Sequence, residues 1–272
     1  MKNLRRELQA GRPVVGSWID TCSPVVAELM AAAGFDFLTV DAEHSGADVT
    51  AAHALFQAVR SGNADCVPVV RLPGSDYATT KRYLDAGAAG VIAPLVNTPQ
   101  QAEAVVAAAK YPPEGRRGVG FCRANMYGLR FEEAVASAND ATLVCVQIEH
   151  TDAVECIDEI LSVPGVDAVF IGPYDLSASL GITGQFDHPD MARATRRVLE
   201  AAARGGVAAG IHVVQPDTDE VARRIEEGYR LIAYSLDVTM LIHECRSGLS
   251  AIRRHIGQWQ ANTTPGGEGG AS

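Results

Sequence analysis

Two carboxylates, Glu149 and Asp175, stand where two apolar runs of the chain end, in TLVCVQIE and DAVFIGPYD. Parallel strands that are buried on both faces read as continuous apolar runs of this kind. A carboxylate at the exit of a buried strand needs a partner for its charge. Two of them at adjacent strands favour a divalent cation with oxygen ligands. Taken alone, either residue could instead cap the helix that is predicted to follow it.

The ends of other predicted strands also carry side chains that could do chemistry. They are Trp18, Asp41, Glu43, His44, Arg71, Gln147, His212 and Asp237. Because barrel enzymes work from the carboxyl ends of their strands, this group predicts a site at that face. Structural alternatives remain open: Arg71 could form an ordinary salt bridge, His44 a local contact, and Trp18 could close the barrel end. We expect His212 and Asp237 to be structural.

Lysine is informative through its positions. The three lysines, Lys2, Lys81 and Lys110, fall on predicted helices, so no amine is expected at a strand end for a Schiff base. Pyridoxal phosphate enzymes and imine-forming aldolases are therefore disfavoured. If a carbanion forms in this protein, a metal ion must act as its electron sink.

Strand-like and helix-like segments alternate along the chain. The predicted strands span 13–19, 35–40, 67–72, 89–94, 142–149, 167–172, 207–213 and 229–236. Most are followed by an amphipathic helix, and we expect the helices that end at Gly34, Gly62, Gly87 and Gly228 to close with a left-handed glycine. Eight such units favour an α/β fold, a closed (β/α)8 TIM barrel in a single domain over 1–261. An open doubly wound sheet is the alternative.

The segment between Lys110 and Ala141 interrupts this alternation. It is rich in Pro, Gly and Arg, and loops of this length in compact domains are usually functional. Because it comes after the fourth strand, we expect it on the same face as the carboxylates. Its RRGVG string does not open a helix within a βαβ unit, so a dinucleotide-binding fingerprint is not supported.

Composition excludes several classes of protein. A net charge of −10 argues against a nucleic-acid partner, which requires a clustered basic surface. No run of 18 uncharged apolar residues or signal-peptide pattern is present, so we expect no membrane partner and a cytoplasmic location. The six cysteines show no CxxC spacing and are expected to be reduced thiols. Residues 262–272 are predicted to form a flexible C-terminal tail.

Several strings of the sequence carry a family resemblance. They are DAEH at 41–44, VPVVR at 67–71, YPPEGRRGVG at 111–120, VQIE at 146–149 and GVDAVFIGPYDLSASLG at 165–181. From about Leu4 to Ile256 the chain resembles the HpcH/HpaI aldolases, which are metal-dependent (class II) pyruvate aldolases. The family includes 4-hydroxy-2-oxo-heptanedioate and 2-keto-3-deoxy sugar acid aldolases. The resemblance therefore predicts the chemistry better than it predicts the substrate.

The resemblance also implies a role for individual positions. Glu149 and Asp175 would bind the metal, Mg²⁺ or Mn²⁺, with Co²⁺ as a further option. Arg71 would sit beside the keto oxygen of bound pyruvate. His44 would transfer a proton, held in orientation by the carboxylate of Asp85.

Other expectations concern the substrate and the assembly. Gln147, on the strand of the metal ligand Glu149, would support pyruvate, and Trp18 could line the pocket. Tyr174 replaces a small residue common in the family, so its ring could reshape the site of the second substrate. Arg123 on the long loop could meet the distal end of the aldehyde. The family's usual hexamer, with exchanged C-terminal helices, suits the apolar segment 238–252, although that segment could instead complete the ring of helices.

These observations lead to one principal hypothesis and two alternatives. We expect a divalent-metal-dependent aldolase, a carbon–carbon lyase that reversibly cleaves a 4-hydroxy-2-oxo acid into pyruvate, by way of its metal-stabilised enolate, and an aldehyde. One alternative is an acyl-CoA lyase like the citrate lyase β-subunit, whose cofactor would need the cluster Arg116, Arg117 and Arg123. The other is a metal-binding barrel without catalysis.

Overall fold

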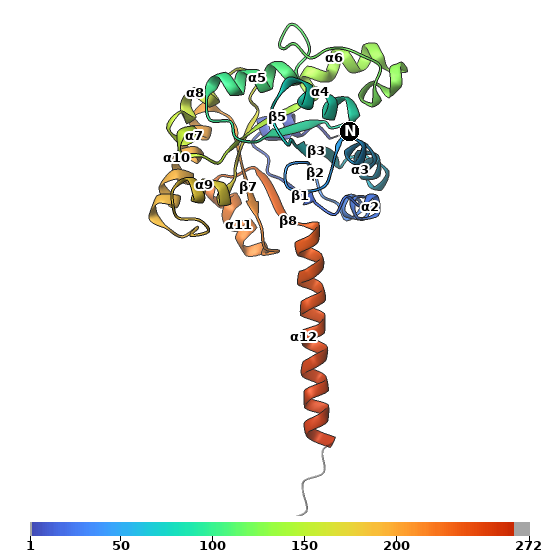
Figure 1. Ribbon diagram of the computed structural model, residues 1–272, viewed down its shortest axis with the longest axis vertical. Coiled ribbons are helices and arrows are strands. Elements are labelled where there is room, and N and C mark those ends of the chain that lie inside the picture. Colours follow the sequence, from blue (N-terminus) through green and yellow to red (C-terminus); the bar gives the residue numbers. More distant parts are fainter. Residues whose placement is uncertain (1, 264–272) are drawn as a thin grey trace, which may run out of the picture.

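A computed structural model of the protein describes residues 2–263 and shows a closed barrel of eight parallel strands (Figure 1). The strands are β1 (Val14–Ile19), β2 (Phe37–Asp41), β3 (Val67–Arg71), β4 (Gly90–Ala93), β5 (Leu143–Ile148), β6 (Ala168–Ile171), β7 (Ala208–Val213) and β8 (Leu231–Leu236). Each strand pairs with the next in sequence, and β8 pairs with β1, which closes the sheet. The predicted TIM barrel is confirmed, and the open sheet is excluded.

Side chains along each strand alternate between the inside and the outside of the barrel. The inward set is one buried cluster that includes Val14, Trp18, Phe37, Cys145 and Phe170. The outward set packs against the helices in a second, larger cluster. Glycines complement the large rings inside the barrel. A Cβ on Gly16 would lie 2.5 Å from the Phe37 ring, and one on Gly210 would lie 2.6 Å from Phe170.

Helices surround the barrel. They are α1 (Leu4–Gln9), α2 (Pro24–Ala32), α3 (Val49–Gly62), α4 (Tyr77–Ala86), α5 (Pro99–Ala109), the 3₁₀ helix η1 (Arg123–Gly128), α6 (Phe131–Ala141), α7 (Thr151–Glu155), α8 (Ile157–Leu161), α9 (Pro173–Ser179), α10 (Pro189–Gly205), α11 (Thr218–Glu227) and α12 (Asp237–Thr263). Gly34, Gly87 and Gly228 adopt the expected left-handed conformation. Gly62 does not, and its role is close packing, because a Cβ there would lie 2.2 Å from the Glu28 carbonyl oxygen.

The long segment after β4 lies elsewhere than its position in the sequence suggested. It follows α5, so it begins at the amino end of the barrel, where Lys110 Nζ donates to the Thr142 carbonyl just before β5. It then runs along α4, where Gly118 N donates to Tyr77 Oη, and reaches α3 through a contact of Tyr127 with His53. The expectation that this loop emerges with the carboxylates is therefore wrong, since a complete helix precedes it.

The last helix, α12, leaves the barrel instead of packing on it (Figure 1). Its side chains from Leu241 to Gln260 are exposed, apart from a partly buried Ala251. The alternative in which this segment completes the ring of helices is therefore wrong for the single chain. Because α12 runs to Thr263, it crosses the predicted boundary at 261/262. The rest of the predicted tail, 264–272, lies outside the described residues.

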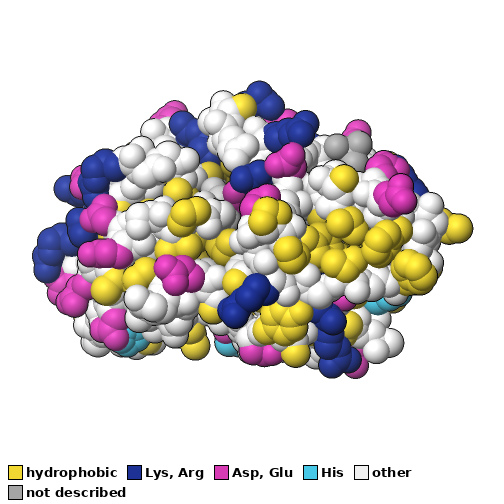
Figure 2. All heavy atoms as spheres, turned by 90° about the horizontal axis from the view of Figure 1, so that it is seen from above, with side chains coloured by type: hydrophobic (Ala, Val, Ile, Leu, Met, Phe, Trp, Pro, Cys, Tyr) yellow, Lys and Arg dark blue, Asp and Glu magenta, His cyan; other side chains and the backbone are white. Residues whose placement is uncertain are grey.

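Other surface features bear on the class of protein. Within residues 2–263, no helix is both long and apolar enough to cross a membrane. Viewed along the long axis, acidic and basic side chains are interspersed with a hydrophobic band (Figure 2). The six cysteines are free thiols, of which Cys66 and Cys145 are buried and Cys245 is exposed.

Candidate active site

The carboxyl ends of the strands bring the predicted carboxylates to one end of the barrel. Glu149 follows β5 and is 3% exposed. Its Oε1 accepts a hydrogen bond of 2.7 Å from the Leu95 N–H, and its Oε2 accepts one from Gln147 Nε2. Burial raises the pKa of Glu149, the bonds from Leu95 and Gln147 act in the opposite direction, and the negative charge of Asp175 raises the pKa further. Glu149 follows β5 and Asp175 follows the neighbouring strand β6, so both carboxylates stand at the same end of the barrel, as expected for a pair that shares a cation.

Neither carboxylate serves as a helix cap. The residue that caps α7 is His150, and the one that precedes α9 is Gly172, with Asp175 in the first turn of that helix. The capping alternative is therefore wrong for both Glu149 and Asp175. Asp175 is exposed to solvent, which keeps its carboxylate accessible to a cation.

Gly172 leaves the room that Glu149 occupies. A Cβ at this position would lie 2.6 Å from Glu149 Oε2 and 3.0 Å from Gln147 Nε2. Contacts this short would displace the carboxylate or the amide. The sequence analysis gave Gly172 no role, although a glycine before a proline at a strand end is a sign of close backbone approach.

The chemistry of these groups fits a hard divalent cation. Within residues 2–263, no group of three or more His, Cys, Asp or Glu side chains is placed to hold a metal ion by itself. A pair of carboxylates leaves coordination positions for substrate and water, as Mg²⁺ requires. In addition, Gln147 Oε1 is buried and has no hydrogen-bond partner among the described residues. A buried acceptor of this kind fits a site that takes a ligand.

Arg71, at the end of β3, is held in place by two hydrogen bonds to the Asp41 carboxylate. Its Nε donates to Asp41 Oδ1 at 2.9 Å, its Nη2 donates to Asp41 Oδ2, and its Nε lies 3.3 Å from Glu43 Oε2. Burial alone would raise the pKa of Asp41, but the Arg71 guanidinium and the N–H groups of His44 and Glu43 hold it below its usual value. The salt bridge that was the alternative for Arg71 is therefore observed. It fixes the permanent positive charge of the guanidinium at the barrel mouth.

The partner expected for His44 lies elsewhere in this chain. His44 has a side chain that is 62% exposed, and its Nε2 lies 3.9 Å from Glu43 Oε2. Asp85 instead accepts a 2.7 Å hydrogen bond from Arg117, whose guanidinium stacks at 4.7 Å over the Tyr111 ring. Among the described residues no hydrogen bond joins Asp85 to His44. Orientation of His44 by Asp85 thus stays a prediction.

Arg123 lies with Asp85 in a pocket on the flank of the barrel. This pocket, of about 390 Å³, is also lined by His53, Lys81 and Tyr127, between α3, α4 and the long loop. A Cβ on Gly87 would lie 3.0 Å from Arg123 Nε, so the arginine packs at the end of α4. The single chain therefore does not bring Arg123 beside Glu149, and its contact with the aldehyde stays a prediction.

Trp18 closes the top of the inner core. The ring is 3% exposed, packs edge-on against Phe170 at 5.7 Å, and carries the Arg71 guanidinium 4.5 Å above it. On its other side lies His212, 5.6 Å away between ring centroids. Trp18 thus closes the barrel and also forms a surface beneath Arg71, so both expectations for it are compatible.

The Tyr174 ring packs against the loop that follows α9. It is 53% exposed and meets the Phe186 ring edge-on, with the ring centroids 4.9 Å apart.

Asp237 accepts hydrogen bonds of 3.0 Å from the backbone N–H groups of Asp20 and Thr21. It therefore ties the end of β8 to the end of β1, which is the structural role expected for it.

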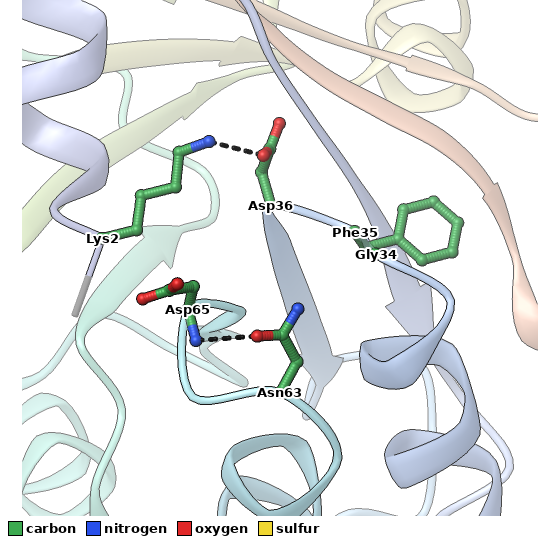
Figure 3. Close-up of a pocket in the computed structure, with 6 residues that line it drawn as sticks. All are labelled: Lys2, Gly34, Phe35, Asp36, Asn63 and Asp65. Carbon is green, nitrogen blue, oxygen red and sulfur yellow. Dashed lines mark hydrogen bonds and ion pairs between the residues drawn. The ribbon is translucent and has the colours of Figure 1, made fainter.

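Another pocket opens at the opposite end of the barrel (Figure 3). It measures about 470 Å³ and lies beside the loops that precede β2 and β3, where Lys2 forms a 2.5 Å ion pair with Asp36. Because these loops enter the strands at their amino ends, the pocket is separated by the packed inner core from the carboxylates.

The fold and the cluster at its mouth define a (β/α)8-barrel enzyme with its reaction site at the carboxyl ends of the strands. The chain belongs to the HpcH/HpaI aldolase/citrate lyase family, whose model matches residues 15–244. The family resemblance drawn from the sequence is confirmed.

Related proteins narrow the chemistry. The hydroxypyruvate/pyruvate aldolase of Roseobacter denitrificans is 36% identical, over 91% of this chain and 95% of the relative. The 4-hydroxy-2-oxo-heptane-1,7-dioate aldolase of Klebsiella pneumoniae is 39% identical, over 86% and 87%. The crystal structure of a family member from Burkholderia cenocepacia, 38% identical, superposes with a TM-score of 0.88 over 92% of this chain and 98% of that one. The prediction of a carbon–carbon lyase of the aldolase type is confirmed by these relatives.

Proposed function

We propose that this protein is a divalent-metal-dependent aldolase that reversibly cleaves a 4-hydroxy-2-oxo acid into pyruvate and an aldehyde. The observation that carries the proposal is the placement of Glu149 and Asp175 just after the neighbouring strands β5 and β6, at the same end of the barrel as the fixed cation Arg71 at the end of β3. The two carboxylates would hold Mg²⁺ or Mn²⁺. When bound, the metal would act as a Lewis acid on the 2-oxo acid and lower the barrier to enolate formation.

The side chains around this pair divide the remaining work. Arg71 would place its positive charge where the keto oxygen gains negative charge. Its hydrogen bonds to Asp41 fix the position of the guanidinium before the reaction begins. Gln147 holds Glu149 through its amide N–H group, and its buried Oε1, which has no partner among the described residues, would support the substrate. The Trp18 ring closes the bottom of the site and excludes water from the core below.

His44 would move the proton. In cleavage, it takes the proton from the 4-hydroxyl group, the bond between C3 and C4 breaks, and the electron pair passes to the pyruvate enolate. Condensation is the reverse. Glu43 lies between Arg71 and His44, and its carboxylate would stabilise a protonated imidazole. To orient His44, Asp85 would need a contact with it that the single chain does not form among the described residues.

The acyl-CoA alternative is less well supported, because the arginine cluster that it requires is not available to bind a cofactor. It requires Arg116, Arg117 and Arg123 to act together on a phosphate-rich cofactor. Arg117 is 4% exposed and is held by Asp85 and Tyr111, so it is not available at the surface. Arg123 packs beside Gly87. The aldolase is therefore the better-supported function.

The test follows the half of the reaction that needs no aldehyde. The methyl signal of pyruvate is recorded by NMR in D₂O with purified protein, with and without Mg²⁺ or Mn²⁺. Loss of the signal that depends on both protein and metal would support the proposal, because it reports formation of the enolate. Equal exchange after treatment with a chelator would refute metal dependence, and metal binding with no exchange would favour the non-catalytic barrel.

We further propose that the protein is a homo-oligomer, with a hexamer as the family precedent, located in the cytoplasm. Exposed apolar side chains on α12 recur at alternating steps of four and three residues. They are Val238, Ile242, Cys245, Leu249, Ile252 and Ile256. This is the heptad pattern of a helix that packs against another helix. A second copy of the chain would cover it, and the free cysteines agree with a reducing compartment.

Leu249→Glu is expected to weaken self-association at least about tenfold, because a Leu contributes about 1.5–3 kcal/mol when it is fully buried and the new charge would be buried with it. Light scattering coupled to gel filtration, over a dilution series, measures the change. Ser247→Glu adds the same charge away from the apolar stripe and serves as the control. A wild-type protein that is monomeric at all concentrations would contradict the assembly.

A further inference from the structure

Asp20 belongs to the ring of side chains at the barrel mouth, although the sequence analysis did not single it out. Alternate residues of β1 point into the barrel: Gly16 faces Phe37, and Trp18 lies in the inner cluster. Asp20, two residues beyond Trp18, continues this inward series just past the end of the strand. It therefore lies at the barrel mouth just after β1, where its backbone N–H is bonded to Asp237 at the end of β8.

The backbone of Asp20 is fixed, but one of its two carboxylate oxygens has no hydrogen-bond partner among the described residues. Asp20 N donates to Asp237 Oδ1 at 3.0 Å, and the next residue, Thr21, donates to Asp237 through both its N–H and its hydroxyl. Asp20 Oδ1 is buried and has no hydrogen-bond partner in the described chain. Burial, together with the charges of Asp41 and Asp237, raises the pKa of Asp20 to about 6, against the opposing effects of Arg71 and His44. A carboxylate held in this way fits the recognition of a ligand.

Trp18 and His212 pack against each other beside the barrel mouth, with ring centroids 5.6 Å apart, and offer complementary polar groups. Trp18 Nε1 is buried and, within residues 2–263, has no hydrogen-bond partner, so it offers a free N–H donor. His212 Nε2 lies 3.1 Å from the Ser235 carbonyl oxygen, so we assign the proton to Nε2 and a free lone pair to Nδ1. Burial lowers the pKa of His212 to about 4, so the ring is neutral at neutral pH.

The charges around Asp20 disfavour an anionic ligand. Asp20 faces the negative charges of Asp41 and Asp237. The nearest fixed cation, Arg71, is already engaged by Asp41 and Glu43. A hydroxyl group fits better, because it can donate to Asp20 or His212 and accept from Trp18 Nε1 at the same time.

We propose that Asp20, with Trp18 and His212, forms the subsite of the aldehyde partner and selects a neutral hydroxyaldehyde over an aldehyde that carries a carboxylate. The inference rests on the proposed aldolase function, because the same mouth must hold both halves of the reaction. It assigns to Asp20 a role in specificity, through direct hydrogen bonding to an aldehyde hydroxyl.

The experiment measures condensation of pyruvate with two pairs of aldehydes of equal chain length. The glyceraldehyde ratio is kcat/KM for glyceraldehyde divided by kcat/KM for propanal. The succinic semialdehyde ratio is kcat/KM for succinic semialdehyde divided by kcat/KM for butanal. Both values in a ratio are measured on one preparation of metal-loaded protein. Because each ratio uses one preparation, loss of active protein or of metal cancels. Asp20→Leu is expected to lower the glyceraldehyde ratio about tenfold or more, since it removes a hydrogen bond to a charged group. Asp20→Asn is expected to raise the succinic semialdehyde ratio severalfold, since it removes the repelling charge.

The control is Asp140→Asn, which removes the same charge from an exposed position at the amino end of the barrel, near Arg5. Both ratios should stay at their wild-type values in this variant. If Asp20→Leu leaves the glyceraldehyde ratio unchanged while wild-type protein exchanges the pyruvate methyl protons, the role of Asp20 is wrong and the aldolase stands. If wild-type protein shows no exchange, the proposed function itself fails.

A second readout needs neither metal nor substrate. Because the pKa of Asp20 in the folded protein, about 6, exceeds its ordinary value of 3.8, folding favours the protonated form, and stability is lost as the pH rises through this window. Asp20→Asn removes this effect. Its Tm relative to wild type is therefore expected to increase between pH 4 and pH 7. A Tm difference that is the same at both pH values would overturn the buried carboxylate on which the subsite depends.

Discussion

Glu149→Gln is expected to reduce the metal-dependent exchange of pyruvate methyl protons by at least about a thousandfold. The physical reason is charge: the amide has nearly the shape of the carboxylate and can still accept the Leu95 N–H bond, but it is a much weaker ligand for a hard cation. Lewis-acid stabilisation of the enolate is worth several kcal/mol, and each 1.36 kcal/mol changes the rate tenfold. Proton NMR in D₂O at saturating pyruvate measures the effect.

The matched control for this variant is Glu155→Gln, six residues further on. It removes an equal charge from an exposed position of α7 and should exchange at the wild-type rate. Metal titrations followed by Tm separate binding from chemistry, since a ligand that binds the folded state raises its Tm. The Tm increase caused by Mg²⁺ or Mn²⁺ should disappear in Glu149→Gln and persist in Glu155→Gln. A variant that keeps both the increase and the exchange would refute Glu149 as a metal ligand.

The barrel and the carboxylate pair could be predicted from the sequence because both depend on local periodicity. Apolar runs such as 143–148 and 168–171 are long enough to read as buried strands, and a parallel sheet places every strand end on one face. Arg71, Gln147 and Glu149 were therefore expected at one end of the barrel, where the ends of β3 and β5 place them, and a hydrogen bond joins Gln147 to Glu149. Glycine positions were less certain, since Gly62 serves close packing and not a left-handed turn.

The residues that were misplaced or missed depend on information that is not local. The loop after Lys110 was expected to emerge at the carboxyl ends of the strands, but it follows the helix after the fourth strand and therefore begins at the amino end. The hydrogen bond of Asp85 to Arg117, 32 positions away, could not be foreseen from the sequence, and the contact of Asp85 with His44 stays a prediction. Asp20 was missed because only the tertiary structure shows that one oxygen of its carboxylate is buried without a partner among the described residues. The sequence pattern predicts which face of a helix or strand a side chain takes, whereas its contact partners on other elements depend on tertiary packing.

Arg71→Ala is expected to reduce the exchange of pyruvate protons about 10²–10³-fold while leaving metal binding largely intact. This range is typical when one fixed donor to a developing oxyanion is removed. Among the described residues, the side chain of Arg71 contacts Asp41, Glu43 and Trp18, so it is not needed to hold the cation, which should still bind. The measurement is the exchange rate by NMR at saturating metal, together with the metal-induced change in Tm.

Removal of Arg71 also leaves Asp41 buried without its partner, so the variant could lose activity through loss of fold. Arg71→Lys resolves this point, because it keeps the positive charge but cannot form the two-pronged contact with Asp41. We expect Arg71→Lys to exchange at a rate between those of wild type and Arg71→Ala, and the exposed-residue variant Arg116→Ala at the wild-type rate. Wild-type exchange in a folded Arg71→Ala protein would show that the arginine serves only to neutralise Asp41, and oxyanion stabilisation would then have to come from the metal alone.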